Sequence, residues 1–208
     1  MKSQIVIFFS LLFLFSCDDK IKENYFDKIC KGQNTFRFDT SRNSDNYAIN
    51  ANIEYLGLTS LRNPSDTFYL RVEYSTDTVD KIFEYSFYKS KTSYKVYTFP
   101  VEFKSGKILF NKKNEDPENF AKIFSSKNRD EKFINELEKN NILELPLMNN
   151  VKGYMDNYEI VDGYSIQYSN KCGYGIFIYY DILSKSKQFK EANSISKFVK
   201  YLKEDFDF

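Results

Sequence analysis

The 208-residue chain predicts an α+β fold on three observations. Apolar and polar residues alternate with a period of two between about residues 34 and 111, helical periodicity follows, and the last residues are again apolar at helical spacing. Strands gathered in one part of the chain and helices in another favour α+β over a regular α/β alternation. We expect an antiparallel β-meander of about five strands, followed by helices, a second strand pair and a C-terminal amphipathic helix.

The strand pattern is clearest over residues 68–75, 83–87 and 97–103, where every second residue is aromatic or aliphatic. This alternation is typical of half-buried strands, with one apolar face and one face carrying Tyr, Lys and Glu. Turn-forming residues separate the runs, at positions 63–66, 76–77, 90–93 and 105–106.

Helical signals begin at Asp116, an N-cap residue that precedes a proline, and residues 117–124 are expected to form a short helix. Asn128 and Glu131 have the spacing of a capping box for a second helix. Its apolar residues share one face, and the two asparagines at 140–141 end it. These apolar residues are Phe133, Ile134 and Leu137.

Beyond the helices, residues 142–146 are expected to be extended. A strand pair is predicted at about 164–168 and 176–182, joined by a polar, glycine-containing loop. The spacing i, i+3, i+4, i+7 predicts the closing amphipathic helix, and the acidic residues 204–208 are expected to be its frayed end. The residues with this spacing are Ile195, Phe198, Val199 and Leu202.

The N-terminus has the order of a secretory signal: Lys2, an apolar run over 5–15 and the tetrapeptide LFSC at 14–17. The apolar run is shorter than the roughly 20 residues that span a bilayer. The tetrapeptide resembles the lipobox of bacterial lipoproteins, and this resemblance implies that Cys17 is lipidated and becomes the mature N-terminus. The alternative is a cleaved signal peptide that leaves Cys17 as an ordinary thiol.

The predicted organisation is therefore a lipoprotein signal peptide at 1–16, a lipidated tether at 17–33 and a single α+β domain at 34–208. The acidic residues after Cys17 resemble a surface-export mark in some Gram-negative groups and an inner-membrane retention signal in others. We expect a lipid-anchored protein of the cell envelope at the outer membrane, with the periplasmic and surface faces both open.

Composition excludes several classes of function. Lys+Arg (30) and Asp+Glu (29) nearly cancel, so there is no basic surface to predict nucleic-acid binding. The sequence contains no histidine, which removes the most common general base and transition-metal ligand. We assign no catalytic residue, no metal ligand and no cofactor, and the balance is against an enzyme.

Two cysteines remain if Cys17 is lipidated. Cys30 and Cys172 form an even pair in an oxidising compartment, which predicts a disulfide bond. A loop of this length is worth up to about 5 kcal/mol in the chain-entropy account. The alternative is two separate buried thiols.

A second resemblance covers residues 130–204. The order is a helix, Leu-x-Leu-Pro at 143–146, a polar loop, Asp-Gly at 162–163 opening a strand, a hairpin and a last amphipathic helix. This order resembles a family of uncharacterised bacterial envelope proteins. The resemblance implies a fold and no particular activity.

The candidate site lies around the loop before Gly163. Three acidic residues spaced three apart could gather around a calcium ion or form a solvated acidic loop. Tyrosines, which are enriched in protein interfaces, flank them. The predicted binding surface consists of Tyr154, Asp156, Tyr158, Glu159, Asp162 and Tyr164.

Three functions stay open from the sequence. The favoured one is a non-catalytic protein-binding module anchored to the membrane through its N-terminal lipid, for example an immunity-type lipoprotein that blocks a toxin. An envelope hydrolase that uses carboxylates such as Asp156 and Glu159 is the alternative. The third is a structural or assembly accessory.

Overall fold

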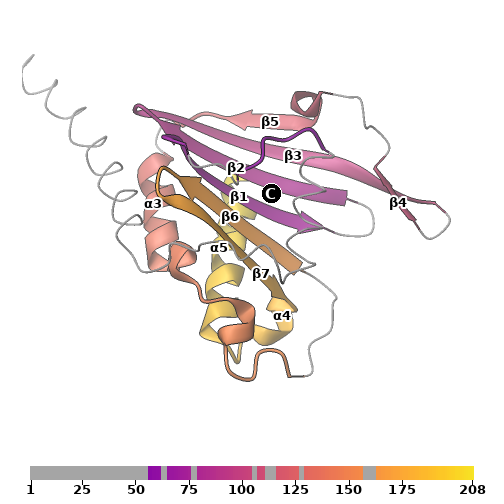
Figure 1. The fold of residues 1–208 in the computed structure, drawn as a ribbon, viewed down its shortest axis with the longest axis vertical. Helices are drawn as coiled ribbons and strands as arrows, with labels where there is room; N and C mark the ends of the chain where they lie inside the picture. The colour runs from indigo at the N-terminus through magenta and orange to yellow at the C-terminus, as the bar shows by residue number, and fades with distance from the viewer. Residues whose placement is uncertain are drawn as a thin grey trace, which may run out of the picture.

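A computed structural model of the chain describes residues 56–61, 65–75, 79–104, 107–110, 116–126, 129–156 and 163–208. Within these ranges the chain forms one antiparallel seven-stranded sheet with helices packed against one face, as the α+β expectation requires (Figure 1). The first part of the sheet is a meander, β1 (Phe68–Ser75), β2 (Val79–Tyr88), β3 (Lys91–Lys104) and β4 (Lys107–Phe110).

The second strand pair joins the same sheet. The strand order is β4-β3-β2-β1-β6-β7, so the hairpin of β6 (Gly163–Asn170) and β7 (Gly173–Tyr180) is added beside β1. The hairpin is longer and its turn shorter than the sequence pattern indicates, because the pairing continues to Asn170 opposite Gly173. A Cβ at Gly175 would lie 2.5 Å from the ring of Tyr168, so any larger residue here would require that ring to move.

Residues 117–124 differ from the expected short helix. Asp116 does cap a helical turn, its carboxylate accepting from the Glu118 N–H, but the 3₁₀ turn η1 (Pro117–Phe120) ends after four residues. The chain then continues as β5 (Ala121–Phe124), which pairs with β3. The backbone bonds of the sheet prevail over a helical pattern that is too short to be stable.

The next helix follows its prediction more closely. In α3 (Asp130–Lys139) the three apolar residues of the predicted face are buried, and Asn141 adopts a left-handed conformation after the helix end. Residues 142–146, expected to be extended, instead begin with the 3₁₀ turn η2 (Ile142–Glu144). A second such turn, η3 (Met148–Asn150), follows.

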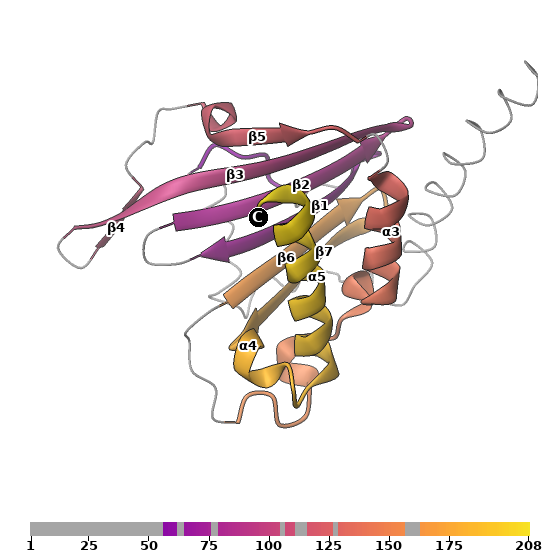
Figure 2. The same ribbon diagram turned by 180° about the vertical axis from the view of Figure 1, so that it is seen from behind.

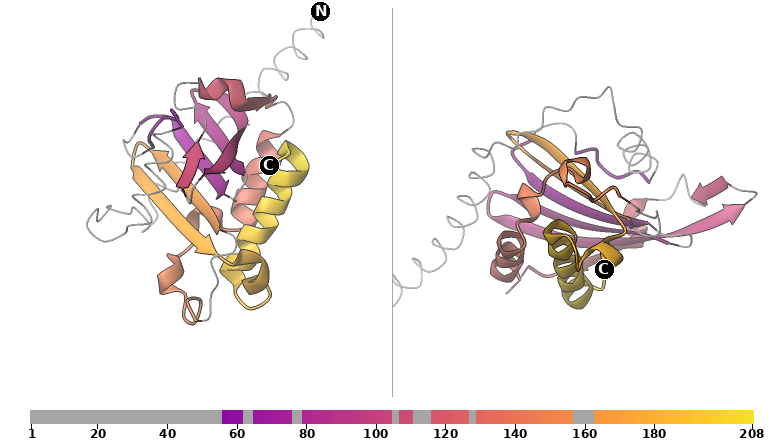
Figure 3. Two further views of the ribbon diagram at one scale, coloured as in Figure 1. Left: turned by 90° about the vertical axis from the view of Figure 1, so that its right-hand side faces the viewer. Right: turned by 90° about the horizontal axis from the view of Figure 1, so that it is seen from below.

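Helices cover one face of the sheet, which we call the helix-covered face (Figures 2 and 3). The long C-terminal α5 (Lys190–Phe206) crosses this face, α3 lies beside it, and the single-turn α4 (Ile182–Lys185) precedes it. Phe133 from α3 lies 4.5 Å from the ring of Tyr85 and 5.7 Å from that of Phe83. The main hydrophobic core therefore forms between this face and the two longer helices.

The C-terminus is anchored rather than frayed. Phe206 is fully buried, with its ring 5.0 Å from Phe83 and 5.1 Å from Tyr94, and Phe208 is also buried. Asp207 takes a left-handed conformation between them and forms an ion pair with Lys122 on β5. The two phenylalanines thus fix the end of α5 to the sheet.

The opposite side of the sheet, the second face, is also largely covered. Residues Leu56–Leu61, here called the strap, lie against it without joining the sheet. Leu58 packs in a cluster with Ile82 and Tyr97, and Leu61 in another with Tyr174. The alternation predicts a sheet with one face exposed to solvent, but the strap covers part of that polar face.

None of the helices in the described ranges combines the length and the apolar character that a membrane crossing requires.

Candidate functional site

The predicted binding surface is only partly a surface. Tyr154 is fully buried and Tyr164 is 4% exposed, so neither can be the contact residue that the sequence suggests. Tyr164 opens β6 on the helix-covered face and stacks on Tyr74, with ring centroids 4.8 Å apart. Aromatic rings on this face stabilise the fold because they are buried in the core, away from water.

Tyr154 ties the loop before β6 to the sheet from inside. Its hydroxyl donates to the backbone carbonyl of Tyr180, at 2.9 Å, and its ring lies 4.9 Å from that of Phe189. The side chain is therefore an internal support of residues 151–156 and not part of their outer face.

The acidic part of the prediction is placed for one residue. Asp156 is exposed, while Tyr158, Glu159 and Asp162 lie outside the described residues. In the ranges that the structure describes, no three carboxylate or cysteine groups are arranged to hold a metal ion. The choice between a calcium site and a solvated acidic loop stays a prediction.

Lys185 fixes the outer part of this loop. The side chain is 7% exposed, and its ammonium donates to the carbonyls of Tyr154, at 3.0 Å, and Asp156, at 2.7 Å. It also lies over the rings of Tyr154 and Phe189, at 5.7 and 5.5 Å from their centroids. A buried ammonium needs such hydrogen bonds, so the loop and α4 are held against each other.

Two apolar side chains project to solvent from these two segments. Met155 is 38% exposed and lies between Tyr154 and Asp156, whose carbonyls accept hydrogen bonds from Lys185. Leu183 is 70% exposed and lies in the same helical turn as Lys185. We call Met155, Asp156 and Leu183 the loop–α4 surface. Its exposed apolar groups on a fixed backbone are what a protein contact requires.

Local backbone choices shape this surface. Gly153 has φ of +79°, a left-handed conformation that glycine adopts without strain, and it turns the chain just before Tyr154. On the other side, Asp181 is left-handed and its carboxylate accepts a hydrogen bond from the hydroxyl of Ser184. These two turns set the positions of Met155 and Leu183.

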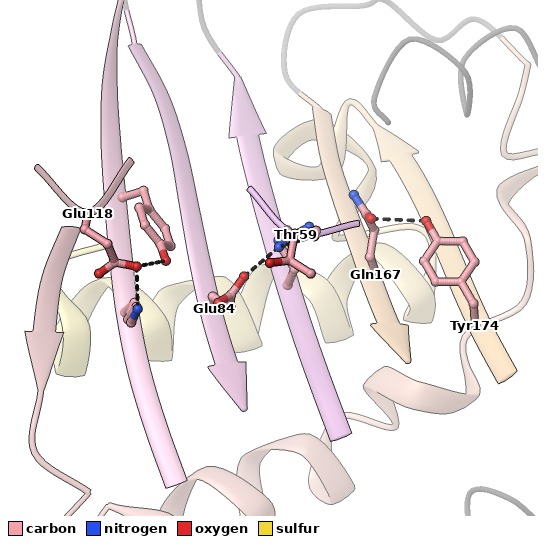
Figure 4. A network of polar contacts seen from close by, with 8 residues as sticks. Thr59, Glu84, Glu118, Gln167 and Tyr174 are labelled. Atoms are coloured by element: carbon pink, nitrogen blue, oxygen red, sulfur yellow. Dashed lines mark hydrogen bonds and ion pairs between the residues drawn. The ribbon is translucent and has the colours of Figure 1, made fainter. Parts of the chain in front are cut away.

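A separate row of polar contacts runs across the second face (Figure 4). On β3 and η1, Glu118 accepts from the ammonium of Lys95 at 2.6 Å and from the hydroxyl of Tyr97 at 3.4 Å. On β6 and β7, the hydroxyl of Tyr174 donates to the side-chain oxygen of Gln167 at 3.1 Å. The row thus draws side chains from most strands of the sheet.

Arg71 of β1 occupies the middle of this row and is fully buried. Its Nη2 donates to the carboxylate of Glu84 at 2.6 Å and to the carbonyl of Thr59 at 3.0 Å, which joins the strap to the sheet. Figure 4 shows Thr59 in front of the sheet and α5 behind it. A guanidinium in this position is stabilised by its carboxylate partner.

Glu73 follows two residues later on the same face and is 4% exposed. Burial, and then the charge of Asp80, raise the pKa of Glu73 to about 8, while the nearby Arg71 acts in the opposite direction. Glu73 is therefore mostly protonated at neutral pH.

Sequence reasoning did not identify this polar row. Arg71 and Glu73 alternate with Leu70 and Val72, which is the pattern of a strand whose polar face meets solvent. The strap contacts that face through the carbonyl of Thr59 and the leucines at 56, 58 and 61, and it has no periodic signal of its own. Nothing local to β1 could have revealed it.

The predicted lipidation and disulfide sites fall mostly outside the described ranges. Cys17 and Cys30 lie there, and Cys172 is at the turn between β6 and β7, where its N–H donates to the side chain of Asn170. Lipidation of Cys17 and the bond between Cys30 and Cys172 stay predictions.

Comparison with models of known protein families finds no match, and comparison with curated protein sequences also finds none. The resemblances to lipoproteins and to an uncharacterised envelope family therefore rest on the sequence motifs alone.

Proposed function

We propose that the chain is a lipid-anchored lipoprotein of the bacterial envelope whose folded domain binds another protein. The observation that carries the binding role is the loop–α4 surface, where Leu183 is 70% exposed beside a backbone fixed by the buried Lys185. The lipid-anchoring role rests on the lipobox at 14–17, and the outer membrane is the location we propose for the anchored protein.

A contact through this surface has a physical basis. Most of the binding energy of an interface comes from a few side chains that become buried. A rigid backbone also limits the conformational entropy that is lost when the contact forms. The two hydrogen bonds from Lys185 provide that rigidity around Met155.

The partner is a protein of the envelope or one that reaches it from outside, as a toxin does for an immunity-type lipoprotein. The segment that follows Met155, residues 156–162, contains three acidic residues and no basic residue. A partner with an apolar centre and basic residues at its rim would match this composition.

The hydrolase alternative has one observation in its favour. Glu73 carries the raised pKa, about 8, that is typical of a general acid. It is, however, 4% exposed on the second face, so a substrate could not reach it in this arrangement. The carboxylates that sequence reasoning named for catalysis were Asp156 and Glu159, of which Asp156 is placed and exposed.

The test uses the full chain in its own cells. After chemical cross-linking, we expect the wild-type protein to be recovered with a partner at a fixed ratio and the Leu183→Asp variant to lose at least about tenfold of it. Ile123→Asp is the matched control, because Ile123 is 68% exposed on β5. Equal recovery with both variants, or equal loss, would refute a contact through the loop–α4 surface.

A further inference from the structure

The strap is an unusual connection, because it crosses the sheet instead of pairing with it. Its leucines reach the apolar side chains of β2 and β3 at one end and those of β7 at the other. From β3 to β7 there are four strand spacings, about 19 Å. The five residue steps of the strap span at most about 17 Å, and the chain turns at Gly57 (φ +73°), so the leucine side chains, not the backbone alone, bridge the distance to the outer strands.

Arg71 holds the middle of the strap. Its Nη2 donates both to the carbonyl of Thr59, on the strap, and to the carboxylate of Glu84, on β2. Because Glu84 lies on β2 and not on the strap, its ion pair with Arg71 would remain if the strap moved away. The contact with Thr59 can therefore break without leaving Arg71 as an isolated charge.

The closed second face leaves polar atoms without partners. Within the described ranges, Arg71 Nε and Nη1, Glu73 Oε2 and Ser169 Oγ are buried and make no hydrogen bond. Each such atom makes the closed state less favourable, because water would bond to it if the face were open. The helix-covered face is filled mainly with packed aromatic rings, and the hydroxyl of Tyr201 on α5 is a buried atom of that core that makes no hydrogen bond within the described ranges.

We propose that the strap is a releasable cover and that Arg71 is its latch. When the strap lifts, hydrogen-bonding side chains of β1, β6 and β7 become accessible while the core between the sheet and the helices stays packed. These side chains are those of Arg71, Glu73, Gln167, Ser169 and Tyr174. The device lies on the opposite face of the sheet from α5 and does not depend on the proposed protein contact.

Thiol labelling of the full chain tests this proposal. Ser169→Cys places a reporter on the second face with little change in shape and with no hydrogen bond lost, since Ser169 Oγ has no partner. Ala192→Cys, at a fully buried position of α5, reports opening of the helix-covered core. Peptide-level mass spectrometry separates position 169 from Cys172, because trypsin cleaves after Lys171.

We expect position 169 to be labelled at least about tenfold faster than position 192 under native conditions. Arg71→Lys, which keeps the charge but not the shape of the guanidinium, is expected to accelerate labelling at 169 and not at 192. Leu61→Ser, which removes one strap anchor, is expected to do the same if the Arg71 variant does not fold. Equal labelling rates at both positions, or equal acceleration at both, would overturn the proposal.

Discussion

Glu73 and Lys185 are both buried ionisable residues, but among the residues that the structure describes only Lys185 has hydrogen-bond partners that stabilise its charged form. The ammonium of Lys185 is bonded to two carbonyls, whereas Glu73 Oε2 has no partner within the described part of the chain. The first charge therefore holds two segments together, and the second is suppressed by protonation.

The protonation of Glu73 makes stability depend on pH. Its pKa is raised from 4.5 to about 8, so between these values the unfolded chain loses a proton that the folded chain keeps. Stability then falls as the pH rises through this window, by roughly 3 kcal/mol at pH 7. Glu73→Gln, which is neutral at every pH, is expected to remove that loss and to be more stable than the wild type above pH 6.

Urea unfolding at pH 5, 6, 7 and 8 measures this difference. Glu131→Gln, at an exposed position of α3, is the control and is expected to follow the wild type. If Glu73→Gln kept the pH dependence of the wild type, Glu73 would not be the protonated group.

Removal of the Lys185 ammonium is expected to loosen the loop–α4 surface. Lys185→Met keeps most of the side-chain volume but leaves the carbonyls of Tyr154 and Asp156 without their donor, at a cost of about 2–4 kcal/mol. Hydrogen exchange at residues 151–156 and urea unfolding report the two consequences. Lys187→Met changes an exposed residue nearby, and an equal effect of both substitutions would contradict the role given to Lys185.

Among the elements, α5 contributes more than an amphipathic face. Phe206 fills a fully buried position between Phe83 and Tyr94 at the very end of the helix. Phe206→Ala is expected to destabilise the protein by about 3–5 kcal/mol, because it opens a cavity between the helix and the sheet. Thermal or urea unfolding measures the change, with exposed Glu204→Ala as the control. If Phe206→Ala lowered the free energy of unfolding by less than about 1 kcal/mol, the end of α5 would instead be frayed, as the acidic sequence suggests.

The elements that sequence patterns predicted well are those with a long, regular period. The strands at 68–75 and 97–103, the α3 helix and α5 each repeat their apolar residues often enough to define a face. Residues 117–124 carry too few residues for a period, and there a 3₁₀ turn and β5 replace the expected helix. Tertiary pairing with β3 decides that segment, and pairing between distant segments leaves no local signal.

The candidate site was harder to predict for the same reason. The sequence predicts Tyr154 and Tyr164 as surface residues, but both are buried, because a tyrosine in a loop or strand does not show which way it faces. Whether it meets solvent depends on Phe189, Tyr74 and other residues far along the chain. Met155 and Leu183, which do meet solvent, lie 28 residues apart, on two segments that the hydrogen bonds of Lys185 join.

In the whole protein, anchoring and binding are assigned to different parts of the chain. The lipobox assigns anchoring to Cys17, so Cys17→Ser is expected to move the protein from the membrane fraction to the soluble fraction. Fractionation of cells that produce the full chain measures this, and Cys172→Ser serves as a cysteine control that should stay in the membrane fraction. Retention of the Cys17 variant in the membrane would contradict the lipoprotein assignment.

The most direct test of the central claim is a photo-cross-link from position 183 in intact cells. A photoreactive phenylalanine analogue replaces Leu183 in one variant and Ile123, which is similarly exposed on β5, in another. We expect a discrete cross-linked protein from position 183 that is absent from position 123 and is lost when Met155→Asp is added. Cross-links of equal yield from both positions, or none from position 183, would contradict a protein-binding function of the loop–α4 surface.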